Sequence, residues 1–174
     1  MKLSGLLILT CVLAVGCGGD DTPAAPSTPN TVSFNATLLP ANELSPNLVT
    51  NAEASGRGTA AITFNLTRNT AGAIQSGTVD FHFDLTNFPA GTPIRLAHIH
   101  TGTSTVSGAV LIDTGLSAAA PLGLTSGAGS WETKGVTADA ATLQSIIDNP
   151  AGFYFNVHSA TNPSGVARGQ LVKQ

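Results

Sequence analysis

Cysteine is almost absent from this sequence. The 174 residues include two cysteines, Cys11 and Cys17, and both lie near the N-terminus. The rest of the chain therefore has no thiol that could form a disulfide bond, act as a nucleophile or bind a metal ion. We expect its stability to come from the packing of apolar side chains and not from cross-links.

Charged residues are also scarce. They make up 10% of the chain, the formal net charge is −3, and Lys and Arg are not clustered. Nucleic acid is therefore not expected as a partner. The sequence also lacks a G-x-S-x-G elbow, an H-E-x-x-H motif and a phosphate-binding glycine loop. We expect no enzyme activity, with metal-dependent redox chemistry left open.

The first residues have the pattern of a secretory signal. Lys2 is followed by an apolar run from Leu6 to Val15, and small residues flank Cys17. This run is shorter than the roughly 18 to 20 apolar residues of a spanning helix. We interpret residues 1–16 as a cleaved signal peptide.

The segment LAVGC, which ends at Cys17, resembles a bacterial lipobox. The resemblance implies that Cys17 is lipidated and anchors the protein to a membrane. Because Gly18 follows it in place of aspartate, we expect an exported protein held in the cell envelope, at the outer membrane or the cell surface. Residues 17–30 are rich in proline and in small and acidic residues, which favours a flexible tether.

Residues 31–174 have the length of one domain and alternate apolar and polar side chains. The clearest case is the segment GTVDFHFDLTNF, in which Val79, Phe81, Phe83 and Leu85 share one face. Segments beginning near residues 32, 58, 94, 108, 129, 152 and 165 have similar strand patterns. The fold class that this pattern predicts is all-β, an antiparallel immunoglobulin-like or Greek-key sandwich or barrel.

One segment departs from the strand pattern. In TADAATLQSIIDNP, Leu143, Ile146 and Ile147 recur at helical spacing, and Pro150 follows as a stop. We predict one short helix of about three turns, with Thr137 as the candidate N-cap and Asp139 in its first turn.

Two histidines stand one residue apart in the segment RLAHIHTG. On a strand, His98 and His100 would project from the same face. A third histidine, His158, alternates with core residues in the segment FYFNVHS. Imidazole nitrogen suits copper and zinc, so these three residues are candidate ligands for one ion. The alternative is a group of neutral histidines held by backbone carbonyls or by Asn156.

The fourth histidine, His82, sits between Asp80 and Asp84 on the polar side of its strand. Such a face is usually solvated, so we leave His82 out of the candidate site.

The two histidine segments together resemble the chordin-type (CHRD) domain family. The match lies in AHIHTGTSTVSGAVLIDT and, some forty residues later, in GFYFNVHSATNPSGVARGQL; the opening segment LLPANELSP is similar to the start of the family pattern. The resemblance covers residues 31–171 and implies an all-β domain in secreted or anchored proteins, with no established enzyme activity. The family pattern marks His98, His100, Asn156, His158, Arg168, Gly169 and Gln170.

Two functional hypotheses follow. In the first, the domain is a non-catalytic binding or structural module that meets an extracellular protein or a glycan, with Asn156, Arg168 and Gln170 in a polar network. In the second, it is a metalloprotein that binds copper or zinc through His98, His100 and His158 for storage, sensing or redox chemistry.

Overall fold

A computed structural model describes residues 30–174 of the chain. The predicted signal peptide, the predicted lipidation of Cys17 and almost all of the predicted tether lie outside these residues. Within residues 30–174, no helix is both long enough and apolar enough to cross a membrane.

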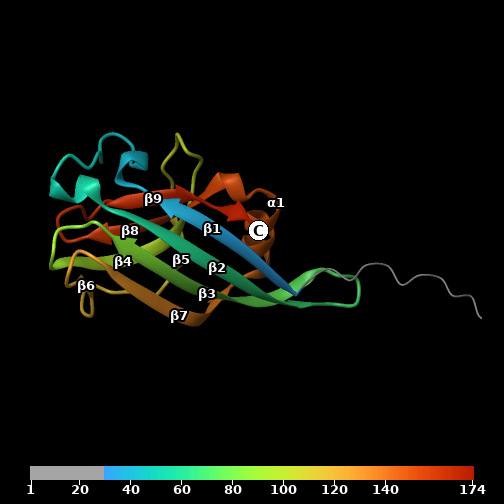
Figure 1. Cartoon of the computed structure of the whole chain (residues 1–174). Helices are drawn as coiled ribbons and strands as arrows, with labels where there is room; N and C mark the ends of the chain where they lie inside the picture. Colours follow the sequence, from blue (N-terminus) through green and yellow to red (C-terminus); the bar gives the residue numbers. More distant parts are fainter. Residues whose placement is uncertain (1–29) are drawn as a thin grey trace, which may run out of the picture.

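Two antiparallel sheets pack face to face, as the alternating pattern predicted (Figure 1). The first sheet has the order β10-β1-β2-β3-β7, and the second has the order β5-β4-β8-β9 with β6 added beside β4. The strands of the first sheet are β1 (Thr31–Leu38), β2 (Arg57–Arg68), β3 (Ile74–Thr86), β7 (Gly129–Ala138) and β10 (Val172–Lys173). Those of the second are β4 (Thr92–Thr101), β5 (Val110–Asp113), β6 (Leu122–Leu124), β8 (Phe153–Ser159) and β9 (Ala167–Gln170).

The core lies between the sheets and is built from one face of each strand. Phe34, Phe64 and Phe83 of the first sheet are fully buried, and Ile99 and Phe155 of the second are buried opposite them. Burial of this apolar surface is the main force that holds the sheets together. The prediction that packing alone stabilises the domain fits this arrangement.

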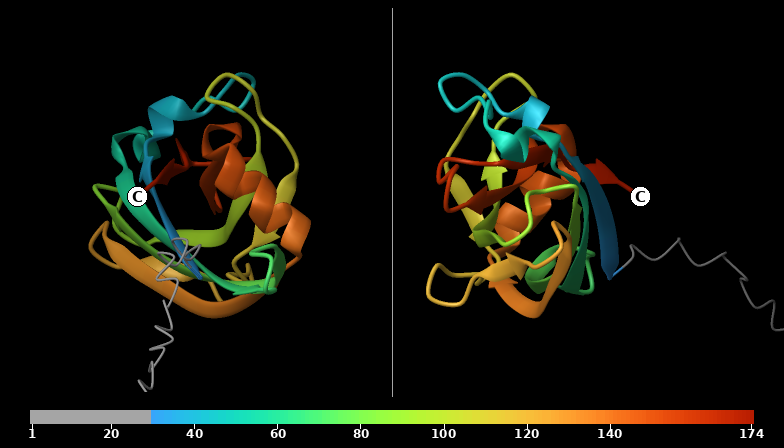
Figure 2. Two further views of the ribbon diagram at one scale, coloured as in Figure 1. Left: turned by 90° about the vertical axis from the view of Figure 1, so that its right-hand side faces the viewer. Right: turned by 60° about the vertical axis from the view of Figure 1, so that its left-hand side comes forward.

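The predicted short helix is present as α1 (Ala140–Asp148). It lies across one end of the sandwich, where it buries Leu143 and Ile146 (Figure 2). The predicted N-cap and the predicted place of Asp139 in the first turn were both wrong. Thr137 belongs to β7, where it pairs with Thr78, and Asp139 caps the helix by accepting a hydrogen bond from the Thr142 N–H. Strand pairing extends β7 to Ala138 and so delays the helix start.

The two sheets also meet along one edge, where β9 approaches β1. Leu39 and Arg168 exchange two backbone hydrogen bonds of 3.2 and 3.3 Å. Gly169 permits this approach, because a Cβ at its position would lie 2.2 Å from the carbonyl oxygen of Thr37. The chain then continues from β1 into two short 3₁₀ helices, η1 (Pro40–Asn42) and η2 (Ala52–Ser55). This segment and the loop 102–109 both rise above β9 in Figure 1.

Candidate metal centre

The outer face of the second sheet is unusual because its polar residues are buried. Ala97 and Ile99 of β4 point into the core, so His98 and His100 point away from it, and they are only 6% and 8% exposed. On β8 the same alternation turns Tyr154, Asn156 and His158 outward, and these are buried too. Loop segments cover this face. Residue spacing alone does not determine which face the histidines take or whether they are buried.

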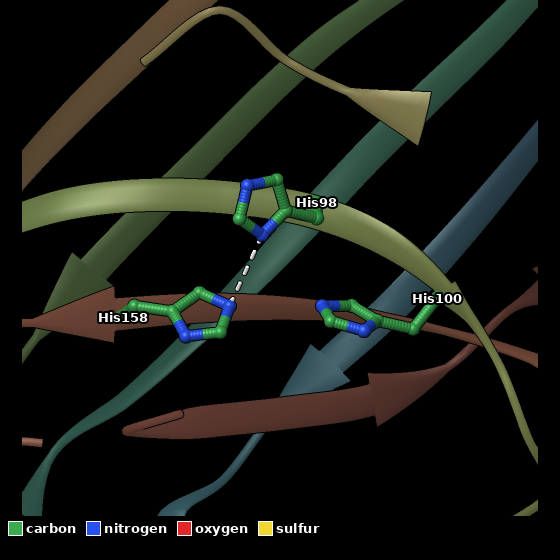
Figure 3. A group of neighbouring side chains, drawn as sticks. All are labelled: His98, His100 and His158. Carbon is green, nitrogen blue, oxygen red and sulfur yellow. Dashed lines mark hydrogen bonds between the residues drawn. The ribbon is translucent and has the colours of Figure 1, made fainter. Parts of the chain in front are cut away.

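Strand register brings the three predicted ligands together. β4 and β8 are neighbours, with His98 opposite Asn156 and Leu96 opposite His158, so His158 lies diagonally from His98. Nδ1 of His98 is 3.2 Å from Nε2 of His158. One nitrogen from each of His98, His100 and His158 lies within 4.8 Å of the others. In Figure 3 the rings of His100 and His158 point toward each other, with the ring of His98 above them.

Backbone carbonyls fix the proton positions on two of the rings. Nδ1 of His158 is 3.0 Å from the carbonyl oxygen of Pro163, and Nδ1 of His100 is 3.1 Å from that of Gly108. A carbonyl only accepts, so each Nδ1 donates and each Nε2 carries the lone pair. The predicted carbonyl partners are therefore present, and they leave the lone pair of each Nε2 directed away from the carbonyls; that of His100 has no partner, and that of His158 accepts from His98.

The third ring, that of His98, has two partners. Its Nδ1 donates to Nε2 of His158 at 3.2 Å, and its Nε2 is 3.9 Å from a carboxylate oxygen of Asp113. Moving the proton to Nε2 would turn that N–H toward Asp113 and present the Nδ1 lone pair to an ion. A carboxylate behind a ligating histidine is a common way to hold the ring.

All three histidines are held in the neutral form at neutral pH. Burial lowers the pKa of His158 to about 4, and the neighbouring His98 adds to the shift. Burial also lowers the pKa of His98, against the opposing effect of Asp113. Burial lowers the pKa of His100, the hydrogen bond to Gly108 opposes this shift, and the neighbouring His98 and Arg168 add to the lowering. Neutral imidazole is the form that binds metal ions.

Tyr154 separates His100 from a buried cation. The ring of His100 stacks on that of Tyr154 with centroids 4.9 Å apart and planes at 8°. The guanidinium carbon of Arg168 lies 3.4 Å from the centroid of the same tyrosine ring. Because β8 lies between β4 and β9, the two groups flank Tyr154 on opposite sides. Arg168 therefore lies near the histidines but is separated from them by an aromatic ring.

Arg168 and Gln170 also hold the loop 102–109. Arg168 donates to the carbonyl oxygens of Thr103 and Val106 at 2.8 and 3.3 Å, and to the hydroxyl of Ser107 at 3.1 Å. Gln170 donates to the carbonyl oxygen of Gly102 at 3.1 Å. Since Gly108 of this loop accepts from His100, these bonds help to position a candidate ligand.

Glu43 is a buried carboxyl group that the sequence interpretation missed. It lies in the segment LLPANELSP, beside Asn156, and burial raises its pKa to about 7 even though Arg168 and Asn156 act in the opposite direction. Its Oε1 and the Oδ1 of Asn156 are both buried without a hydrogen-bond partner among residues 30–174. A Cβ on Gly165 would collide with both side chains. The only advance signal was an acidic residue in an otherwise apolar and small segment.

His82 lies away from this cluster, on the outer face of the first sheet, as its pattern suggested. It is exposed, and its Nε2 is 3.0 Å from a carboxylate oxygen of Asp84. The structure thus unites His98, His100 and His158 with Asn156, Arg168 and Gln170 on one face, and it adds Tyr154, Glu43 and Asp113.

The fold and this cluster together define a small two-sheet β protein with a buried three-histidine centre. Residues 34–171 match the CHRD domain, and the chain belongs to this family. No curated protein and no solved structure matches the chain.

Proposed function

We propose that this CHRD domain binds one copper or zinc ion through His98, His100 and His158, in an exported protein that Cys17 anchors to the cell envelope. The histidine centre is the only group of three or more His, Cys, Asp or Glu residues with converging ligand atoms within the described part of the chain. Three histidines are a sufficient protein ligand set for zinc when the fourth position is left to water.

The observation that carries this proposal is the unpartnered Nε2 of His100. It is buried, and no group in residues 30–174 donates to it. A purely structural histidine cluster would account for the carbonyl bonds to His100 and His158 and for the bond between His98 and His158. It would not account for a buried lone pair without a donor, which costs about 1–3 kcal/mol. A metal ion would use that lone pair.

Display on a lipid anchor fits either a storage or sensing role for the ion, or a module that meets an extracellular protein or a glycan. The low charge of the chain supports the absence of nucleic acid among its partners. None of these roles requires the domain to be an enzyme. The bound ion would supply Lewis-acid or redox chemistry, and the chain itself would orient the ligands and exclude water.

Titration calorimetry of the full chain in detergent tests the metal site. The protein should carry Cys11→Ser and Cys17→Ser, which remove every thiol of the sequence. We expect one Cu(II) or Zn(II) per chain at neutral pH. If the chain binds neither Cu(II) nor Zn(II), nor Cu(I) under reducing conditions, more tightly than roughly 10 μM, an affinity of about −7 kcal/mol, the proposal is refuted.

A further inference from the structure

Arg168 carries a buried charge that no carboxylate neutralises at contact distance. Its side chain is 1% exposed, and no ion pair within 4.0 Å involves it in residues 30–174. Every hydrogen bond that it donates ends on a neutral oxygen, of Thr103, Val106, Ser107 or Gln170. Glu43 interacts with it over a longer distance, but the pKa of this carboxyl is about 7, so it is only partly ionised at neutral pH.

This charge acts on the candidate metal centre. Arg168 and His100 lie against opposite sides of one tyrosine ring, at 3.4 Å for the guanidinium carbon and 4.9 Å between ring centroids. The intervening ring excludes water, so the field of the guanidinium is poorly screened.

The candidate ligands bring no negative charge to offset it. All three are neutral imidazoles, and the carboxylate nearest to them, Asp113, is 61% exposed and 3.9 Å from Nε2 of His98. Water screens such an exposed group. A divalent ion at the centre would be repelled by Arg168 about twice as strongly as a monovalent ion at the same distance.

Given the metal site of the proposed function, we infer that Arg168 biases this site toward monovalent copper and against Cu(II) and Zn(II). Thiolate and thioether ligands usually provide such selectivity. Residues 30–174 contain neither cysteine nor methionine. Here the selectivity would come from a fixed positive charge behind one ligand, and Tyr154 would keep that charge from contacting the ion.

This inference is tested by competition with chelators of known affinity, on the full chain with both cysteines changed to serine. One chelator competes for Cu(I) under reducing conditions, and the other competes for Cu(II) in air. The wild-type centre should bind Cu(I) at least tenfold more tightly than Cu(II). Arg168→Gln removes the charge and should lower the ratio of Cu(I) to Cu(II) affinity by about tenfold, a 59 mV fall in the potential of the bound couple. Arg168→Lys keeps the charge and should keep the ratio.

A second substitution changes the net charge around Arg168 in the opposite direction. Glu43→Gln removes the partial negative charge near Arg168 and should raise the ratio of Cu(I) to Cu(II) affinity. A merely structural effect would weaken the binding of both ions alike. Equal ratios in Arg168→Gln and Arg168→Lys, or tighter binding of Cu(II) than of Cu(I) by the wild type, would overturn the inference and leave the metal site standing. If Arg168→Gln does not fold, an unchanged or lower ratio in Glu43→Gln overturns it. Failure of the wild type to bind either ion would instead refute the proposed function.

Discussion

His98 and His158 are sixty residues apart in the chain, yet Nδ1 of the first lies 3.2 Å from Nε2 of the second. This contact exists because β4 and β8 are paired neighbours and because both residues point away from the core. A nitrogen–nitrogen separation of this size is compatible with two ligands of one ion, since metal–nitrogen distances are about 2.0–2.1 Å. In the structure this contact is a hydrogen bond.

Loss of one ligand should remove the metal site without unfolding the domain. His158→Ala leaves two of the three nitrogens, so we expect the affinity for Zn(II) or Cu(II) to fall by at least 100-fold, about 2.7 kcal/mol. The matched control is His82→Ala, because His82 is exposed on the other sheet and touches none of the candidate ligands. Calorimetry on both variants checks the prediction, and equal affinities would contradict it.

The stability of the metal-free domain should fall in acid. The pKa of His158 is about 4 in the folded state, against an ordinary value of 6.5. The unfolded chain therefore takes up a proton first, and the contribution of His158 is complete above pH 6.5 and is lost as the pH falls through about 4. The difference corresponds to about 3 kcal/mol.

Urea denaturation from pH 8 to pH 4 measures this effect. His158→Gln, which cannot titrate, should show a shallower loss of unfolding free energy between pH 6.5 and pH 4 than the wild type. His82→Gln should follow the wild-type profile. Coincident profiles for His158→Gln and the wild type would show that the histidine is not desolvated in the folded protein.

Ionisation of Glu43 should make stability depend on pH in the opposite direction to that of His158. The pKa of Glu43 is about 7 in the folded state and 4.5 ordinarily. Its contribution to stability is therefore complete below pH 4.5 and is lost as the pH rises through about 7. Glu43→Gln removes this loss and keeps a polar side chain beside Asn156. We expect the variant to gain about 1–3 kcal/mol relative to the wild type between pH 4 and pH 8.

The same denaturation series tests Glu43, and Glu132→Gln is its control. Glu132 is an exposed carboxylate 2.7 Å from the ammonium group of Lys134, and its substitution should leave the high-pH end of the profile unchanged. If Glu43→Gln and the wild type keep a constant difference from pH 4 to pH 8, Glu43 does not change its ionisation on folding.

Much of the fold could be predicted because strand alternation is a local property. Val79, Phe81, Phe83 and Leu85 were assigned to one face, and all four are buried in the core. The N-cap of α1 could not be placed in the same way. Thr137 has good capping chemistry, but it pairs with Thr78 of a strand far away in the sequence, and this pairing decides where the helix begins. Local propensity does not contain such information.

The candidate ligands could be named from the sequence, but their proximity in the folded protein could not be predicted. Spacing places His98 and His100 on one face, whereas the proximity of His158 depends on which strands pair and in which register. The burial of Glu43 could not be predicted for a related reason. Nothing within its own segment indicates that the segment folds over the outer face of a sheet made of later strands.

Lipidation of Cys17 is a prediction from the signal sequence alone. Cys17→Ser should leave an uncleaved precursor without acyl chains, because the serine hydroxyl cannot form the thioether of a lipidated cysteine. Mass spectrometry of the protein recovered from membranes checks the outcome. Cys11→Ser is the matched control and should be acylated as the wild type is, since Cys11 would leave with residues 1–16. A normally acylated Cys17→Ser protein would disprove the assignment.

The close contact between β9 and β1 should make Gly169 intolerant of any side chain. A Cβ at this position would lie 2.2 Å from the backbone oxygen and 2.7 Å from the backbone carbon of Thr37, and neither atom can move without displacing β1. Gly169→Ala should therefore lower the free energy of unfolding by about 1–3 kcal/mol.

Gly123→Ala is the control, because a Cβ there meets no atom within 4 Å. Since alanine also restricts the unfolded chain more than glycine does, the control should be neutral or slightly stabilising. Urea midpoints that fall equally in the two variants would mean that β9 does not approach β1 as closely as the strand pairing of Leu39 and Arg168 requires.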